Sequence, residues 1–216
     1  MSEIKDSNSL ALKDYGINEL LSKDSMYISW LEVEKAIAHA QGELGIIPQE
    51  FANTIEQRAQ YKNINLEKVN ALYLQQGHSF YPFVEVFSDE CGEAGKYVHY
   101  GVTTQNVQQT GELLVAKEIN SRFLIIISDI LENLANLAEK YSESIMPGRT
   151  HGRHAVPITF GFKVATWISD ILGATQQVKN FHSSGFTSMC GGAVGAYNSL
   201  GELGPELNSR VGDILG

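Results

Sequence analysis

The stretch "MPGRTHGRHAVP", residues 146–157, concentrates side chains that can do chemistry. Two arginines and two histidines stand there between two prolines, and long helical patterns flank them. Imidazoles exchange protons near neutral pH and guanidinium groups bind carboxylates, whereas cationic groups at this density repel one another unless they are solvated or face an anion. The stretch therefore predicts one wall of a site for an acidic ligand.

Two further segments are more polar than helical periodicity explains. One is "QQGHSF" around His78, and the other is "YVHYGVTTQNVQQT", residues 97–110. The candidate residues of the second segment are His99, Thr103, Thr104 and Gln105. We expect all three polar segments at helix starts, where backbone N–H groups lack partners and the helix dipole favours negative charge. A simpler interpretation is that Thr103, Thr104 or Asn106 only caps a helix and His78 only occupies a turn, although capping and ligand binding can coexist.

The elements that must position these residues are helices. Apolar residues at helical spacing predict a helix in residues 25–48, with weaker patterns across residues 49–63, 65–76 and 79–95. The strongest pattern runs from Gln105 to Tyr141 and predicts a helix about 55 Å long at about 1.5 Å per residue. A second long pattern follows Pro157, and the glycine-rich "SSGFTSMCGGAVGAYNS" ends it just before a third begins.

No convincing strand alternation or repeat is visible, so the predicted fold class is all-α. We expect a small helical N-terminal domain over residues 1–102 and the first part of a long-helix bundle over residues 103–216. The glycines have no Walker-type or dinucleotide spacing, and they are consistent with a turn alone.

Composition excludes several classes of function. A net charge of -9 argues against nucleic acid and anionic membrane surfaces as partners, so an anion site must be local. Cys91 and Cys190 lack metal-binding or redox spacing, and the histidines lie in separate segments, so no metal site is expected. Residues 1–16 have no apolar core of signal-peptide length, and the longest apolar run, Phe123–Ile127, is too short to span a bilayer. A cytosolic protein is expected.

The order of the motifs is more specific than any one of them. The succession "GH", "VHYGVTTQN", "GRTHGRHAVPITFG" and "GGAVGAY" resembles the fumarase/aspartase superfamily of lyases. The resemblance is greatest to the branch that holds adenylosuccinate lyase and 3-carboxy-cis,cis-muconate cycloisomerase, and it covers the chain from about Trp30 onward. Such enzymes remove a proton next to a carboxylate, stabilise the resulting carbanion and expel a leaving group from the neighbouring carbon; most release fumarate. They use no cofactor for this step.

The resemblance also implies residue roles. By motif position, His151 resembles the general acid toward the leaving nitrogen, and His78 an assistant that orients or recharges it. Thr103 and Thr104 resemble the hydroxyl pair that binds the succinyl carboxylates. The remaining implied site residues are His99, which resembles a histidine that meets the substrate phosphate in adenylosuccinate lyases, Gln105 beside Asn106 in a position that bears on leaving-group specificity, Arg149, which fixes the motif's loop, and Thr150, which completes the motif.

Two departures from the branch leave alternatives open. The basic and aromatic phosphate signature is not recognisable in "SLALKDYGINELL", and the loop of the form G-S-S-x-M-P-x-K-x-N-P that carries the family's serine base does not occur. The resemblance therefore implies the N-terminal half of a homotetrameric enzyme with sites shared between subunits and a di- or tricarboxylate substrate, and a chain inactive by itself. The alternatives are a 3-carboxymuconate cycloisomerase and a noncatalytic helical oligomerisation module.

Overall fold

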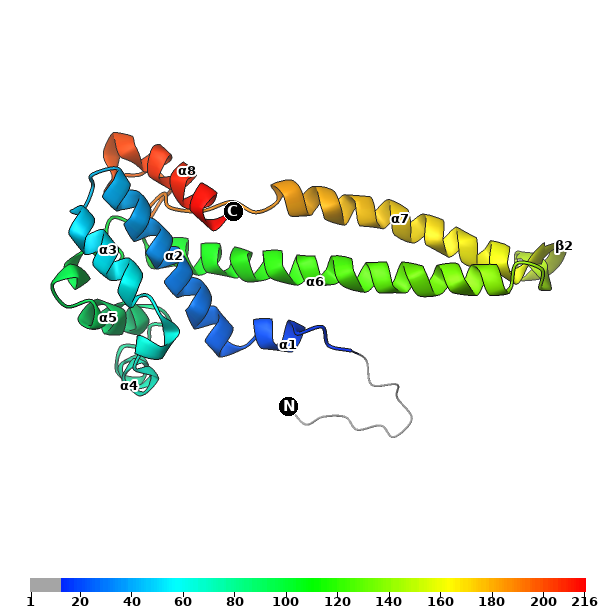
Figure 1. Cartoon of the computed structure of the whole chain (residues 1–216), viewed down its shortest axis with the longest axis horizontal. Helices are drawn as coiled ribbons and strands as arrows, with labels where there is room; N and C mark the ends of the chain where they lie inside the picture. Colours follow the sequence, from blue (N-terminus) through cyan, green and yellow to red (C-terminus); the bar gives the residue numbers. More distant parts are fainter. Residues whose placement is uncertain (1–12) are drawn as a thin grey trace. The chain divides into compact units, whose positions relative to one another are not determined.

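The structure, a computed structural model, describes residues 13–216 (Figure 1). These residues form two compact units, one of residues 13–19 and 118–185 and the other of residues 20–117 and 186–216. Most of the N-terminal stretch in which we expect no signal peptide, residues 1–12, lies outside the described part. The predicted domain boundary between residues 102 and 103 stays a prediction.

The unit of residues 20–117 and 186–216 is built from helices around α2 (Lys23–Glu43). Ser22 caps α2 by accepting a hydrogen bond from the Ser25 N–H, and Asn65 caps α4 in the same way through the Lys68 N–H. The other helices are α3 (Gln49–Arg58), α4 (Leu66–Gln76), α5 (Tyr81–Glu90), α8 (Gly204–Leu215) and the first part of α6 (Thr104–Lys140). Three 3-10 helices also lie here: η1 (Tyr61–Asn63), η2 (Gly92–Tyr97) and η3 (Gly201–Leu203).

The core of this unit surrounds α2, which packs against α3 and α8. An aromatic cluster joins α2 to α5: the Trp30 ring lies 4.8 Å from Phe80 and 5.4 Å from Phe83, centroid to centroid. The start of α6 approaches α2 closely, because a Cβ atom on Gly111 would lie 2.8 Å from Ser29 Oγ and 2.9 Å from Trp30 Cδ1. The residues that begin α6 therefore stand on a packed support.

The other unit consists of the remainder of α6, α7 (Phe160–Ser184) and a two-stranded antiparallel hairpin between them, β1 (Ile145–Thr150) and β2 (Arg153–Thr159) (Figure 1). It also takes in part of the short α1 (Ile17–Leu20). The two long helices are antiparallel, since Asn120 of α6 meets His182 near the end of α7 at 3.0 Å. At the other end, a Cβ atom on Gly161 would lie 2.4 Å from the Ala138 carbonyl oxygen.

The all-α prediction is confirmed, and α6 and α7 match the two long patterns of the sequence. The prediction that residues 146–157 lie at a helix start is wrong, because they form the hairpin. The physical reason is the His151-Gly152 pair, whose φ values of +49° and +75° are those of the two central residues of a type I′ turn. Thr150 pairs with Arg153 across this turn. Within residues 13–216, no helix has the length and apolar character needed to cross a membrane.

Candidate functional site

A pocket of about 400 Å³ lies where α6 begins. Its walls come from α6 and from the glycine segment, which we define as residues 188–197, together with one residue of α8. The lining residues are Thr103, Gln105, Asn106, Gln109, Ser188, Met189, Cys190, Gly191, Gly192, Ala193, Gly195, Tyr197 and Asn208. The polar motif around Thr103 and the glycine-rich motif, which lie more than 80 residues apart in the sequence, therefore form one cavity. Both motifs are visible in the sequence.

Side chains of two helices hold the glycine segment in place. Asn106 Oδ1 accepts hydrogen bonds from the Gly192 N–H at 3.0 Å and the Thr103 N–H at 3.1 Å. Thr110 Oγ1 accepts one from the Met189 N–H at 3.0 Å, and Asn208 Oδ1 accepts one from the Cys190 N–H at 2.8 Å. Neutral acceptors on three backbone donors fix the segment without adding negative charge to the pocket.

The conformation of the glycine segment requires glycine at several positions. Gly192 and Gly195 have φ values of +78° and +75°, and a Cβ atom on Gly191 would lie 2.8 Å from Gly195 Cα. The segment faces the first turn of α6, where backbone N–H groups lack intrahelical partners. A cavity walled by a helix start and a segment with three glycines suits a carboxylate.

Among the predicted residues at the start of α6, Gln105 lines this pocket, as does Thr103, which directly precedes the helix. Thr104 is the first residue of the helix. Asn106 also lines it, and its cap-like bond to the Thr103 N–H is the capping role considered from the sequence. Capping and a position on the pocket wall coexist in this residue.

His99 stands just before α6 and bonds to a buried carboxylate. Its Nδ1 lies 2.6 Å from Glu34 Oε1, and its backbone N–H donates to Glu34 Oε2 at 3.1 Å. Glu34 belongs to α2 and is 1% exposed. Sequence reasoning missed Glu34, because one acidic residue within an amphipathic helix carries no local signal of its partner.

His78 caps α5. Its Nδ1 accepts hydrogen bonds from the Phe80 N–H at 3.1 Å and the Tyr81 N–H at 3.0 Å. The neutral imidazole therefore carries its proton on Nε2. The neighbouring Ser79 accepts a bond from Gln108 of α6 at 3.3 Å, which links this turn to the helix that lines the pocket.

The three remaining candidates, Arg149, Thr150 and His151, lie on the hairpin of the other unit. Arg149 is opposite His154 and Thr150 is opposite Arg153, and His151 occupies the turn. The side chains of these three residues, and those of Arg153 and His154, are exposed. Opposite residues of a hairpin project from the same face, so Arg149 and His154 share one face and Thr150 and Arg153 the other.

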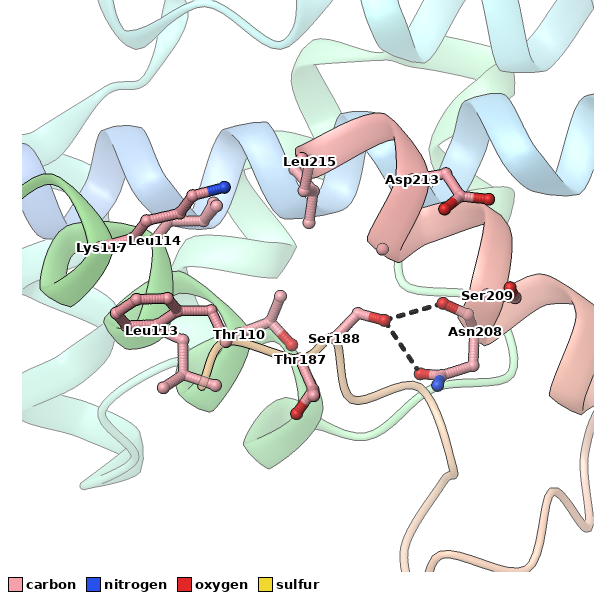
Figure 2. Close-up of a pocket in the computed structure, with 13 residues that line it drawn as sticks. Thr110, Leu113, Leu114, Lys117, Thr187, Ser188, Asn208, Ser209, Asp213 and Leu215 are labelled. Atoms are coloured by element: carbon pink, nitrogen blue, oxygen red, sulfur yellow. Dashed lines mark hydrogen bonds between the residues drawn. The ribbon is translucent and has the colours of Figure 1, made fainter. Parts of the chain in front are cut away.

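A second pocket, of about 360 Å³, lies between α6, residues 186–188 and α8 (Figure 2). It holds none of the predicted site residues. Ser188 and Asn208 line both pockets, and Ser188 Oγ donates to the Asn208 carbonyl oxygen at 2.7 Å. This bond, drawn in Figure 2, joins the two residues that the cavities have in common.

Cys190 lines the first pocket, but its thiol is buried. Burial, with a smaller effect of the Glu34 carboxylate, raises the pKa of Cys190 to about 12. A thiol that stays protonated is a poor nucleophile, so this cysteine packs the pocket wall. Within residues 13–216, no three histidine, cysteine, aspartate or glutamate side chains come together in a way that could hold a metal ion.

Comparison with known proteins identifies relatives of this chain. A family model described as Lyase matches residues 13–213. The chain is 38% identical over 189 residues to N-acetyl-S-(2-succino)cysteine lyase of Dickeya dadantii and 37% identical over 187 residues to adenylosuccinate lyase of Methanothermobacter thermautotrophicus. Each alignment covers 86% of this chain but only 41% or 42% of the relative, so the chain spans about two fifths of the length of these curated relatives.

Solved structures give the same result. The fumarate lyase of Mesorhizobium sp. BNC1 superposes with a TM-score of 0.87 at 31% identity, over 96% of this chain and 50% of that one. The beta-carboxy-cis,cis-muconate cycloisomerase of Acinetobacter calcoaceticus sp. ADP1 gives 0.85 at 26% identity, over 92% and 48%. The predicted resemblance is confirmed: this chain belongs to the fumarase/aspartase superfamily of lyases and corresponds to the N-terminal half of its members.

Proposed function

We propose that this chain supplies the carboxylate-binding part of a lyase that eliminates a group from a succinyl-type substrate and releases fumarate. The observation that carries the proposal is the pocket at the start of α6. Thr103 and Gln105 meet there with the backbone of the glycine segment, which Asn106 fixes by a 3.0 Å bond to Gly192. Hydroxyl, amide and backbone N–H donors at a helix start are what a carboxylate needs.

The same donors serve the elimination chemistry. When a base removes the proton next to the substrate carboxylate, negative charge moves onto the carboxylate oxygens. Donors already fixed around those oxygens bind more strongly in that state than in the ground state, and this difference accelerates the step. We assign the clamp to Thr103 and Thr104, with Gln105 and His99 as further substrate-binding residues.

His151 is the proposed general acid. The leaving atom takes its proton as the bond to the neighbouring carbon breaks, and an imidazole is the side chain best suited to exchange a proton near neutral pH. Its exposed position on a turn leaves both ring nitrogens accessible. We assign His78 as its assistant, and Arg149 and Thr150 as residues that shape the hairpin around it.

These assignments include an acid and a clamp but no base. We therefore propose that the 216 residues alone have little or no turnover, and that complete sites form in a cytosolic homotetramer from segments of several subunits. The substrate is a di- or tricarboxylate. Adenylosuccinate lyases of several organisms are similar to this chain, which favours a nitrogen leaving atom. The 38% identity to a succinocysteine lyase makes sulfur the second candidate.

One alternative function has an observation in its favour. The likeness to the Acinetobacter cycloisomerase suggests a lactonisation of 3-carboxymuconate in place of an elimination that releases fumarate. Because both reactions proceed through a carbanion next to a carboxylate, the same clamp would serve either one.

The test uses protein expressed from its native gene. Ultraviolet absorbance should report fumarate released from adenylosuccinate or from N-acetyl-S-(2-succino)cysteine, and Thr103→Val should lower kcat/KM by about a hundredfold through the loss of one donor. Thr54→Val makes the same chemical change on α3 and should leave kcat/KM unchanged. Activity on 3-carboxymuconate alone would favour the cycloisomerase, and a Thr103→Val enzyme as active as the parent would refute the clamp.

A second measurement addresses the chain itself. On titration of the 216-residue chain with fumarate, we expect amide chemical shifts to change at Thr103, Gly191 and Gly192. A noncatalytic helical oligomerisation module would show none of these changes. If the chain formed oligomers but showed none of these shift changes, the result would favour the oligomerisation module.

A further inference from the structure

Glu34 is a charged residue that the proposed chemistry does not use, although it is almost completely buried. It is 1% exposed on α2, and its carboxylate bonds to His99 alone among the described residues: to the backbone N–H through Oε2 and to Nδ1 through Oε1. Burial of a carboxyl group is costly unless its oxygens are hydrogen-bonded. The two contacts, at 3.1 and 2.6 Å, provide that compensation.

The backbone at His99 gives a second, independent observation. Its φ value of +62° is uncommon for a residue with a side chain, and such strain persists only where the surroundings enforce it. Glu34 enforces it by holding the backbone N–H. Gln41, two turns further along α2, also reaches this loop and donates to the Tyr100 carbonyl oxygen at 2.7 Å. One face of α2 therefore holds the loop that leads into α6.

The imidazole itself is fixed from two sides. Glu34 takes Nδ1, and the Phe80 ring lies 5.5 Å away, centroid to centroid. No described residue bonds to Nε2, and the His99 side chain is 14% exposed. An imidazole whose Nδ1 donates to a carboxylate presents its Nε2 as the only nitrogen available to a ligand.

We propose that Glu34 is a positioning residue, which holds His99 with Nδ1 protonated so that Nε2 faces an anionic group of the substrate. The role of Nε2 rests on the proposed function, whereas the bond and the protonation of Nδ1 do not. When the ring carries both protons, Nε2 donates a charge-assisted hydrogen bond to that anionic group. Proton exchange with the substrate is not required of this pair.

The test is the ¹⁵N NMR spectrum of the histidine rings in the 216-residue chain. We expect His99 Nδ1 to have the chemical shift of a protonated nitrogen in the parent chain. In Glu34→Gln, the Nδ1 resonance should move away from that position. The reason is that an amide has one oxygen and can accept only one of the two bonds that the carboxylate accepts. An unprotonated Nδ1 in the parent chain would overturn the proposal even if Glu34→Gln did not fold.

A second histidine–glutamate pair, between His39 of α2 and Glu56 of α3, provides a matched control. His39 Nδ1 is 3.0 Å from Glu56 Oε1, and the His39 side chain is 39% exposed. Glu56→Gln makes the same chemical change at this solvated pair, and it should leave the His99 resonances unchanged. If Glu34→Gln and Glu56→Gln both left His99 unaffected, the contact with Glu34 would not set the state of the ring.

Kinetics of the protein from the native gene separate the two proposals. Glu34→Gln should raise KM by about tenfold, the effect of one weakened charged hydrogen bond, and should change kcat less. A fall in kcat with KM unchanged would overturn the positioning role. If the parent protein released no fumarate while His99 Nδ1 was protonated and sensitive to Glu34→Gln, the proposed function would fail and the contact would stand.

Discussion

The side-chain oxygen of Asn106 accepts a hydrogen bond from the backbone N–H of Gly192, 86 residues further along the chain, at 3.0 Å. The same oxygen accepts from the Thr103 N–H. One buried amide thus caps the longest helix and holds the glycine segment against it. The two walls of the pocket therefore share one acceptor, Asn106 Oδ1.

Asn106→Ala should therefore loosen both walls. The change leaves two backbone donors without their acceptor, and each unsatisfied buried group costs about 1–3 kcal/mol. We expect amide hydrogen exchange at Gly192 and Thr103 to accelerate by at least about tenfold, while exchange in the α2 core changes less. NMR or mass spectrometry can measure the exchange.

The control for this variant is Asn136→Ala. Asn136 is an exposed residue of the same helix, so its replacement should leave exchange at Gly192 unchanged. Equal exchange rates at Gly192 in the parent and in Asn106→Ala would contradict the shared-acceptor interpretation.

The turn of the hairpin determines which substitutions test His151 cleanly. At a φ value of +49°, asparagine is tolerated far better than a β-branched residue. We expect His151→Asn to keep the cross-strand contacts between Thr150 and Arg153, and His151→Val to weaken them at a cost of about 1–2 kcal/mol. Nuclear Overhauser effects across the strands report this directly. If His151→Asn also lost these contacts, a loss of activity in that variant would say nothing about the acid.

Two glycines of α7 should respond in opposite directions to alanine. At Gly161 a Cβ atom would lie 2.4 Å from the Ala138 carbonyl oxygen and 2.8 Å from Ser142 Cα, so we expect Gly161→Ala to lower the unfolding free energy by about 1–3 kcal/mol. At Gly173 nothing lies within 4 Å, and Gly173→Ala should raise it by about 0.5–1 kcal/mol. Thermal unfolding of both variants measures the difference. Equal shifts would mean that α6 and α7 do not pack closely at Gly161.

The sequence predicted the long helices well because their apolar residues recur over many turns. The helix expected from Gln105 to Tyr141 is α6 (Thr104–Lys140). The hairpin was missed because its strands, only six and seven residues long, carry mostly exposed side chains and show no alternation of apolar and polar residues. The pair His151-Gly152 was the available signal, since it resembles the Asn-Gly turns of hairpins.

In the candidate site too, some residues could be predicted from the sequence and others could not. Local motifs identified Thr103, Gln105 and the glycine segment, and the fold brings them to one pocket. Glu34 and Asn208 could not be found from the sequence, because their roles depend on contacts with residues 65 and 18 positions away. Such partners become visible only when the chain has folded.

The two cysteines provide a readout of the packing that supports the pocket. Burial raises the pKa of both Cys91 and Cys190 from 9.0 to about 12, so each thiol stays protonated in the folded chain. The thiolate is the reactive form. Labelling by a maleimide near pH 8 should therefore be slow in the folded protein and rapid in urea, with a rate that follows opening of the surrounding structure.

The raised pKa of the two thiols also determines how the free energy of unfolding changes with pH. Because the thiol pKa is higher in the folded state than in the unfolded state, the protonated thiols add to the free energy of unfolding. This contribution is complete below the ordinary thiol pKa and is lost as the pH rises from about 9 to about 12. Replacing Cys190 by alanine should flatten the fall in unfolding free energy over that range, and urea titrations at successive pH values can measure the slope. Immediate maleimide labelling of Cys190 near pH 8, located by mass spectrometry, would contradict its burial, and with it the packing of the pocket wall against α6 and α8.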